Sequence, residues 1–416
     1  MTPSRVHPCL GVVGADQHCP AHLPGAAPVH GHPGLAGGPI YLDYNATTPV
    51  DPAVLDALLP LLAGQFGNPS SDHHYGAAPR AAVQAARAQV ADLIGAPSDS
   101  IVFTGSGSEA NTLALVGVLS AHGGGHLITQ ASEHPAVLAT CADLAATGRA
   151  TVTHLPVDAT GLVDPDNLAA AIGPDTVLVS VMFANNETGT IQPIAELAAV
   201  AHARGVLLHT DAAQAVGKIP VAVDDLGVDL LSIAGHKVYA PKGVGALYIR
   251  PGTDIRPLIH GGGQERGLRA GTENVALIAG LGAAADLAHA SLGAEAGRLC
   301  ALRDRLHRRL RDHLADRVRL NGHPEHRLPG TLNISVDGVD GHTLLAAAPD
   351  IAASTGSACH SGATTPSPVL SAMGLPDDRA RQAIRLSVGR YTTIDDIDRA
   401  ADLLAAAARA LAPSTA

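Results

Sequence analysis

Two residues of this chain are of types that can bond covalently to a substrate. Lys237 comes directly after the apolar run LLSIAGH (230–236), and Cys359 lies among small side chains in STGSACHSG (354–362). A partly desolvated lysine at a strand end favours its neutral amine, which can form a Schiff base. A thiolate with small neighbours can act as a nucleophile. A turn lysine on the surface and a small buried thiol are the plain alternatives.

An acidic residue and an anion-binding turn follow two other β-rich runs. Asp211 lies near the end of VLLHTDA (206–212), where a carboxylate needs a positive partner such as a protonated pyridine nitrogen, or else caps the next helix. The run FTGSGSEANTLAL (103–115) has the order strand, small-residue turn, helix. Its backbone N–H groups can bind a phosphate, although it is neither a Rossmann nor a Walker A motif and could be an ordinary helix cap.

Further polar side chains follow neighbouring runs. His134 lies in SEHPAV (132–137), and Asn185 and Asn186 begin NNETG (185–189), where turn formation alone is the alternative. In parallel sheets, ligands bind beyond the carboxyl ends of the strands. A lysine for a Schiff base, an acid for a pyridine nitrogen and a phosphate site at that edge together indicate pyridoxal 5'-phosphate.

These residues need a sheet to position them, and the first two thirds of the chain predict one. Short β-rich runs, several of them apolar without alternation, alternate with Ala- and Leu-rich segments, which is typical of a mostly parallel sheet in an α/β domain. The predicted strands are 101–104, 126–130, 151–156, 176–182, 206–212, 230–236 and 244–249, and the predicted helices include 108–121, 134–147, 165–172 and 193–204.

The pattern changes after about residue 265, which predicts a smaller α+β domain. Residues 275–316 have the composition of long helices, with one apolar stripe at spacings of three and four: Leu299, Leu302, Leu306, Leu310 and Leu314. The charged residues opposite favour a solvated face over a partner site: Arg303, Asp304, Arg305, Arg308, Arg309, Arg311 and Asp312. Short strands are predicted at 331–336, 352–359 and 383–390.

Composition excludes several classes of protein. The 416 residues exceed one ordinary core, and the net charge of −11 argues against direct nucleic-acid binding. Five widely spaced cysteines form no disulfide framework, and we find neither a signal peptide nor an apolar, charge-free stretch long enough to span a membrane. A cytoplasmic location is the resulting expectation.

Residues 1–39 differ from the rest, with seven Pro, seven Gly and no apolar period. Such a segment cannot bury enough surface to offset its ordering entropy, so we expect a disordered tail. Its His and Cys residues match no standard zinc spacing, and no metal site is predicted.

Seven motifs, in the same order and spread over about residues 40–405, resemble the cysteine desulfurases of iron–sulfur cluster assembly and nitrogen fixation. The resemblance implies the fold-type I pyridoxal-phosphate architecture and a homodimer. It places a large cofactor domain at 55–270, and a small domain at 40–54 plus 271–416. The motifs are YLDYNATTPVDPAV (41–54), GNPSSDHHYG (67–76), NNETGTIQPI (185–194), DAAQAVGK (211–218), GHKVYAPKGVGALY (235–248), GGGQERGLRAGTEN (261–274) and STGSAC (354–359).

The resemblance also implies roles for individual residues. Lys237 would form the Schiff base with the cofactor, Asp211 would pair with the pyridine nitrogen, and His134 would stack on the ring. Arg385 in AIRLSVGR would bind the substrate carboxylate with a bidentate fork. The remaining implied contacts are Asn186 and Gln214 to the ring oxygen or the substrate, and Gly107, Ser108, Gly235, His236 and Thr272 to the phosphate, with Thr272 coming from the other subunit.

Cys359 occupies the position of the cysteine on the family's mobile loop. By resemblance it takes sulfur from L-cysteine as a persulfide, leaves L-alanine, and passes the sulfur to an acceptor protein of cluster assembly or thiolation. Its spacing to PSPVL (366–370) matches the group with the longer loop. An aminotransferase of the same fold has no use for Cys359, and a selenocysteine lyase or an inactive assembly partner are further alternatives. One departure is Ala234, where the family usually has a serine that contacts the phosphate.

Overall fold

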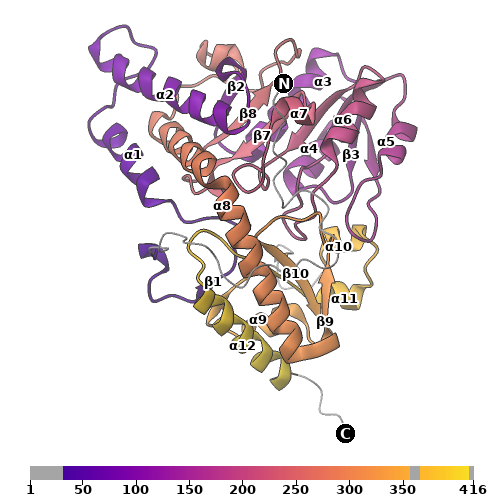
Figure 1. Cartoon of the computed structure of the whole chain (residues 1–416). Coiled ribbons are helices and arrows are strands. Elements are labelled where there is room, and N and C mark those ends of the chain that lie inside the picture. Colours follow the sequence, from indigo (N-terminus) through magenta and orange to yellow (C-terminus); the bar gives the residue numbers. More distant parts are fainter. Residues whose placement is uncertain (1–30, 357–365, 412–416) are drawn as a thin grey trace, which may run out of the picture.

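The computed structural model describes residues 31–356 and 366–411. A seven-stranded sheet lies at the centre of the larger part (Figure 1). In spatial order its strands are β2 (Ile101–Thr104), β8 (Gly245–Ile249), β7 (Leu230–Ala234), β6 (Leu207–Asp211), β5 (Thr176–Ser180), β3 (His126–Gln130) and β4 (Thr151–Leu155). Only β8 runs antiparallel to its two neighbours. The predicted strands and the mostly parallel sheet are therefore confirmed.

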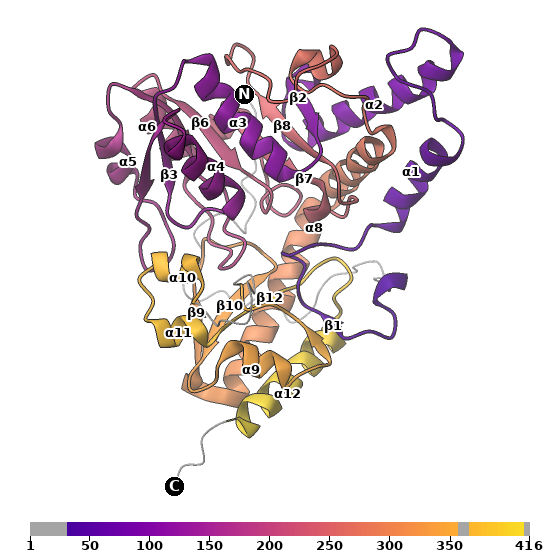
Figure 2. The ribbon, with the colours of Figure 1, turned by 180° about the vertical axis from the view of Figure 1, so that it is seen from behind.

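Helices cover both faces of this sheet, because side chains alternate along each strand. Val102 packs in one core cluster with the helices seen in front in Figure 2, which are α3 (Gly107–Ala121) and α4 (Pro135–Ala146). Phe103 packs in the opposite cluster. The other helices of this part are α1 (Pro52–Ala63), α2 (His74–Leu93), α5 (Pro165–Ala171), α6 (Ile194–His202) and α7 (Val223–Leu226).

One continuous helix, α8 (Val275–Leu314), connects the two parts (Figure 1). Several long helices were expected there, but no residue interrupts the helix. Residues 276–288 pack in the core of the large sheet, beyond the predicted boundary at residue 270, and the predicted leucine stripe packs in the second core. By length and composition alone this helix could cross a membrane. In the structure its apolar side chains contribute to both cores.

The second core belongs to a three-stranded antiparallel sheet in the order β12 (Ala383–Ser387), β10 (Thr331–Val336) and β9 (Val318–Asn321). A short parallel pair joins β1 (Ile40–Tyr41) to β11 (Ile351–Ala352). The strand predicted at 352–359 was wrong in extent, because β11 ends at Ala352 and only Ser354 adds a single bridge to Arg385. The helices are α9 (Gly341–Ala346), α10 (Pro368–Ala372), α11 (Asp377–Arg381) and α12 (Ile394–Ala410).

The arginines of α8 are less solvated than expected. Arg303 is buried, and its Nη1 donates to the carbonyl oxygen of Leu328 at 3.0 Å. Arg305 pairs with Asp398 of α12 at 2.6 Å. The prediction of a purely solvated face was therefore wrong for Arg303, because α8 is covered on more than its leucine side.

Part of the predicted tail is ordered against the fold. Pro33–Leu35 form a short 3-10 helix, η1. Nε2 of His32 lies 2.8 Å from the carbonyl oxygen of Val50, and its ring centroid lies 5.0 Å from that of Tyr391. The described chain thus contacts the fold from His32 onward, eight residues before Ile40. Residues 1–30 lie outside the described residues, and the expectation for them stays a prediction.

Candidate active site

The predicted site residues follow neighbouring parallel strands. Lys237 ends the 3-10 helix η3 (Gly235–Lys237), which directly follows β7, and Asp211 is the last residue of β6. His134 caps α4 after β3, and Asn186 follows β5. Parallel strands bring their carboxyl ends to one edge of the sheet, so these four residues gather there, as the sequence predicts.

Lys237 is held by the backbone of the first motif. Its Nζ donates to the carbonyl oxygens of Asn45 at 2.8 Å and Ala46 at 2.7 Å. Burial and the nearby Arg385 guanidinium lower the pKa of Lys237 to about 8, although Asp211 and Asp43 oppose the shift. A substantial share of the neutral amine is therefore present near pH 8, which is the form that a Schiff base needs.

Asp211 is buried and positioned by two donors. Its Oδ2 accepts from Nδ2 of Asn111 on α3 at 2.7 Å, and its Oδ1 accepts from the backbone N–H of Ala213 at 2.9 Å. The second contact belongs to the turn after β6, where no helix begins, so Asp211 is not the helix cap of the plain alternative. A carboxylate offers about four acceptor positions, and these two donors leave capacity for a further partner.

Two histidines flank the lysine. The exposed His134 accepts from the N–H of Ala136 at 3.1 Å through Nδ1. Desolvation by the surrounding chain lowers the pKa of His134, Asp211 opposes the shift, and Lys237 adds to it. His236 lies with Nδ1 3.1 Å from the hydroxyl of Thr47, and burial together with Lys237 lowers its pKa to about 4. Both imidazoles are therefore mainly neutral at pH 7.

The glycine turn before α3 forms the expected cradle. Ser106 is the N-cap, and its hydroxyl accepts from the N–H of Glu109 at 3.1 Å. A Cβ added to Gly107 would lie 2.9 Å from the Cβ of Ala234, so only glycine fits where the end of β7 approaches the helix. The first-turn N–H groups of a helix have no intrahelical acceptor and bind anions. Ser108, exposed in this turn, adds a hydroxyl.

Arg385 connects the small domain to this edge. On β12, its Nη2 contacts Oδ1 of Asp43 at 2.7 Å, and its Nη1 donates to the carbonyl oxygen of Asn186 at 3.1 Å. The guanidinium is buried, and its Nε has no hydrogen-bond partner among the described residues. A rigid, incompletely paired guanidinium matches the binding of a carboxylate.

Asn45 was not identified from the sequence, although it lies in one of the quoted motifs. Its carbonyl oxygen accepts from both Lys237 and Gln214, the latter at 2.9 Å. Its Nδ2 donates to the carbonyl oxygen of Asn186 at 3.1 Å and to the hydroxyl of Thr331 at 2.8 Å. Its place in the motif YLDYNATTPVDPAV is the signal that could have indicated it. Asn45 therefore connects the lysine to the substrate side of the site.

Cys359 lies outside the described residues, but both flanks of its segment lie at the site. Ser367 donates to Oε2 of Glu187, and a Cβ on Gly356 would lie 2.6 Å from that same oxygen. Glu187 is buried directly after Asn186, and burial raises its pKa. The chain segment that contains Cys359 therefore starts and ends beside the Arg385 side of the site.

The residues present fit pyridoxal phosphate. Pyridoxal phosphate needs an anion site for its phosphate, an amine for its aldehyde and a carboxylate for its ring nitrogen. The edge of the sheet offers all three: a glycine cradle at a helix start, a lysine amine and a buried carboxylate. Oδ1 of Asn111, next to Asp211, is buried without a partner among the described residues. Thr272, expected to contact the phosphate of the other subunit, lies exposed on the surface after η4 (Gln264–Gly267).

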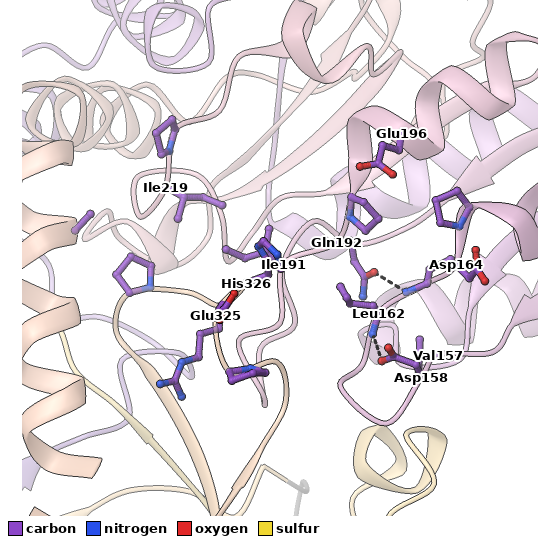
Figure 3. Close-up of a pocket in the computed structure, with 18 of the residues that line it drawn as sticks. Val157, Asp158, Leu162, Asp164, Ile191, Gln192, Glu196, Ile219, Glu325 and His326 are labelled. Atoms are coloured by element: carbon purple, nitrogen blue, oxygen red, sulfur yellow. Dashed lines mark hydrogen bonds between the residues drawn. The ribbon is translucent and has the colours of Figure 1, made fainter. Parts of the chain in front are cut away.

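A cavity of about 1120 Å³ lies elsewhere, between the two parts of the molecule (Figure 3). It contains none of the candidate residues, and its wall includes Ile191 and Ile219. Two of its polar side chains accept hydrogen bonds within the fold: Gln192 accepts from the N–H of Val163 at 2.9 Å and Asp158 from that of Leu162 at 2.9 Å. Nε and Nη1 of Arg327, which also lines the cavity, have no hydrogen-bond partner among the described residues. We therefore assign the chemistry to the strand edge and not to this cavity.

Comparisons with known proteins show which family the chain is similar to. Residues 40–400 match a family described as "Aminotransferase class-V". "Cysteine desulfurase IscS" of Dictyoglomus turgidum is 50% identical over 369 residues, which cover 88% of this chain and 93% of that protein. A solved structure described as "NIFS-LIKE PROTEIN" superposes with a TM-score of 0.83 at 36% identity, covering 88% of this chain and 98% of that one. Another, "SspA in complex with cysteine", has a TM-score of 0.76 at 38% identity, covering 85% and 99%.

Proposed function

The chain belongs to the class-V aminotransferase family, and from that membership and the site we propose that it is a pyridoxal-phosphate-dependent cysteine desulfurase that converts L-cysteine to L-alanine. The observation that carries the proposal is Lys237, whose amine lies at the sheet edge against the carbonyl oxygens of Asn45 and Ala46, with its pKa lowered by burial and by Arg385. The half-identical relative, itself a cysteine desulfurase, supports the choice of L-cysteine as substrate.

Bound pyridoxal phosphate supplies an electron sink that weakens the bonds at Cα of an amino acid. The α3 cradle, Ser108 and His236 would hold its phosphate, Asp211 its ring nitrogen, and Lys237 its aldehyde carbon. Gln214 and Asn186 would contact the ring oxygen or the substrate. The exposed ring of His134 is free to stack against the cofactor.

The protein's own groups bind the substrate and move its proton. Arg385, fixed by Asp43 and by the carbonyl of Asn186, grips the substrate carboxylate and so sets the direction of its side chain. The Lys237 amine, partly neutral near pH 8, accepts the Cα proton and returns a proton later.

Sulfur transfer is assigned to Cys359. Its thiolate attacks the sulfur of L-cysteine, so an S–S bond forms while the Cβ–S bond breaks. The electron pair of that bond remains with Cβ, which takes up a proton to give L-alanine, and Cys359 retains a persulfide. Gly356 and Ser367, which flank the segment that contains Cys359, both lie beside Glu187, on the Arg385 side of the site. This position supports the assignment.

The persulfide sulfur then passes to an acceptor protein, in iron–sulfur cluster assembly or a thiolation pathway. The IscS name of the half-identical relative supports the first of these. We also propose a homodimer, because α1, the segment after it and the start of α2 expose large apolar side chains: Leu55, Leu59, Leu62, Phe66 and Tyr75.

Borohydride trapping tests the lysine assignment, and the chain contains only three lysines. Reduction of the holoenzyme should fix the cofactor on Lys237 and on neither Lys218 nor Lys242, as read by peptide mass spectrometry. Labelling of another lysine, or of none, would refute the site.

Substitution of the cysteine separates desulfuration from other reactions of the family. Cys359→Ser should bind the cofactor normally but form alanine from L-cysteine at least about a hundredfold more slowly, because a covalent route is lost. The wild type should carry extra sulfur on Cys359. Near-normal alanine formation without that sulfur would indicate a selenocysteine lyase or an aminotransferase instead.

A further inference from the structure

A second lysine lies in the site and has no role in the proposed reaction. Lys218 ends the motif DAAQAVGK and is partly buried beside the strand edge. Its Nζ donates to Oε1 of Gln214 at 2.5 Å and to Oδ1 of Asn45 at 3.3 Å. Both acceptors are side-chain amides, and each of them contacts a residue of the proposed machinery.

The contact fixes the orientation of the Gln214 amide. Nε2 of Gln214 donates to the carbonyl oxygen of Asn45 at 2.9 Å, while Oε1 accepts from Lys218. A flipped amide would place its NH₂ against the lysine hydrogens and its oxygen against a carbonyl oxygen, so both contacts would turn repulsive. With Lys218 in place, Gln214 presents its N–H donors on the side of Lys237 and Asn45.

The same lysine fixes the Asn45 amide. Because Oδ1 of Asn45 accepts from Lys218, Nδ2 must point to the carbonyl oxygen of Asn186, 3.1 Å away. That carbonyl oxygen also accepts from Nη1 of Arg385 at 3.1 Å. One amino group thus determines the hydrogen-bond polarity on both the cofactor side and the substrate side of the site.

The charges around Lys218 are positive. Burial, and then Lys237 and Arg385, lower its pKa to about 7, and Lys218 in turn helps to lower the pKa of His236. A hydrophobic or amide side chain at this place would avoid the repulsion, so electrostatics alone does not explain a lysine here. What explains a lysine at this position is its capacity to donate to two acceptors at once.

We infer that Lys218 is a positioning residue that holds Gln214 and Asn45 in a single amide orientation, and through them the ring-oxygen donor and the carbonyl of Asn186 that Arg385 contacts. This inference rests on the proposed function, since Gln214 acts there on the cofactor. Lys218 itself touches neither cofactor nor substrate, so its substitution should act only through the two amides.

A double-mutant cycle on cofactor affinity tests this coupling. In apo-protein titrated with pyridoxal phosphate, Lys218→Met should raise the Kd about tenfold, because the amide loses its donor. Lys218→Arg should raise it less than about threefold, since arginine also only donates. In a Gln214→Ala background, Lys218→Met should add less than about twofold. The exposed Lys242→Met is the matched control and should change the Kd in neither background.

An equal loss in both backgrounds, or no rescue by arginine, would overturn the inference. If Lys218→Met does not fold, NMR of the lysine side chains in ¹⁵N-lysine-labelled wild-type apo-protein tests the inference instead. Only three are present, assigned through Lys218→Arg and Lys242→Met. The Lys218 amino hydrogens should exchange slowly with solvent because they donate to two amide oxygens, whereas exchange as fast as that of the exposed Lys242 would contradict the inference.

Neither measurement depends on turnover, so the two proposals can fail separately. A wild type that binds pyridoxal phosphate but forms no alanine from L-cysteine would refute the proposed function and leave the cycle intact. Normal desulfuration with a fully additive cycle would refute only the role of Lys218.

Discussion

At the residue scale, burial decides which groups of the site carry charge. Lys237 and Lys218 both contact Asn45. Burial and Arg385 lower the pKa of Lys237 to about 8, and burial together with Lys237 and Arg385 lowers that of Lys218 to about 7. On the acidic side, burial raises the pKa of Glu133 to about 8, with Asp211 adding to the shift. Glu133 is therefore protonated at neutral pH.

Glu133→Gln should change the pH dependence of folding stability. The native carboxyl keeps its proton up to about pH 8, whereas the unfolded one loses it near 4.3, so the native state binds more protons between these values. Wild-type stability should therefore fall relative to the variant as pH rises through this window, by at most about 1.4 kcal/mol per unit. Urea unfolding of apo-protein at pH 5, 6, 7 and 8 measures the difference.

The exposed Glu196→Gln serves as the control and should run parallel to the wild type. Burial raises the pKa of the Cys141 thiol to about 12, and Glu133 adds to this shift. Parallel curves for wild type and Glu133→Gln would mean that Glu133 is ionised in the native state.

Arg385→Lys should weaken substrate binding selectively. A lysine cannot keep the contacts to Asp43 and Asn186 and also form a two-pronged contact with a carboxylate. The KM for L-cysteine should rise about tenfold or more, while the affinity for pyridoxal phosphate changes less than about twofold. Steady-state kinetics with the exposed Arg399→Lys as control checks this, and an unchanged KM would remove Arg385 from the substrate site.

At the element scale, the ends of strands and helices position the reactive side chains, and one buried ion pair stabilises the turn next to this edge of the sheet. Glu265 in η4 accepts two contacts from Arg87 of α2, at 2.6 and 2.7 Å, and the N–H of Phe103 in β2 at 2.8 Å. Glu265 has a φ of 46° and Arg266 a φ of 57°, a region that costs non-glycine residues energy. The ion pair holds this turn near the start of the α3 cradle.

Arg87→Met should destabilise the protein strongly, because it leaves the Glu265 carboxylate buried without its cation. We expect a loss of about 3–5 kcal/mol in the free energy of unfolding. Arg80 of the same helix pairs at 3.7 Å with the exposed Asp72, so Arg80→Met should cost less than about 1 kcal/mol. Urea unfolding compares the two, and equal costs would show that the Glu265 pair carries no special weight.

At the scale of the whole molecule, α8 joins the two cores, and α1 leaves an apolar face uncovered. Val54 and Leu58 of α1 are buried, whereas Leu59 and Leu62 are 46% and 61% exposed and Phe66 is 75% exposed. Large apolar side chains gathered on one face indicate a protein–protein contact. The partner that we propose is a second copy of the chain, which would also bring the exposed Thr272 into reach of a neighbouring site.

Leu59→Glu combined with Leu62→Glu should therefore shift the protein from dimer to monomer. Two carboxylates at the centre of an apolar interface would have to be buried unpaired. Light scattering coupled to size exclusion measures the mass, and glutamates at the exposed Ala53 and Ala57, off the apolar row, provide a comparison on the same helix. A wild type that is monomeric at micromolar concentration would contradict the proposal.

The sequence by itself determined the sheet, its edge and the residues that could react there. Strands are short and their pattern is local, so the runs ending at Asp211 and Ala234 could be recognised without the fold. The tertiary structure decided what local patterns do not contain: that Asn45 would serve Lys237, that Lys218 would fix two amides, and that Arg303 would be buried. Each of these contacts joins residues far apart in the chain or depends on how helices pack, and hydrogen-bond polarity and burial exist only once those segments have met.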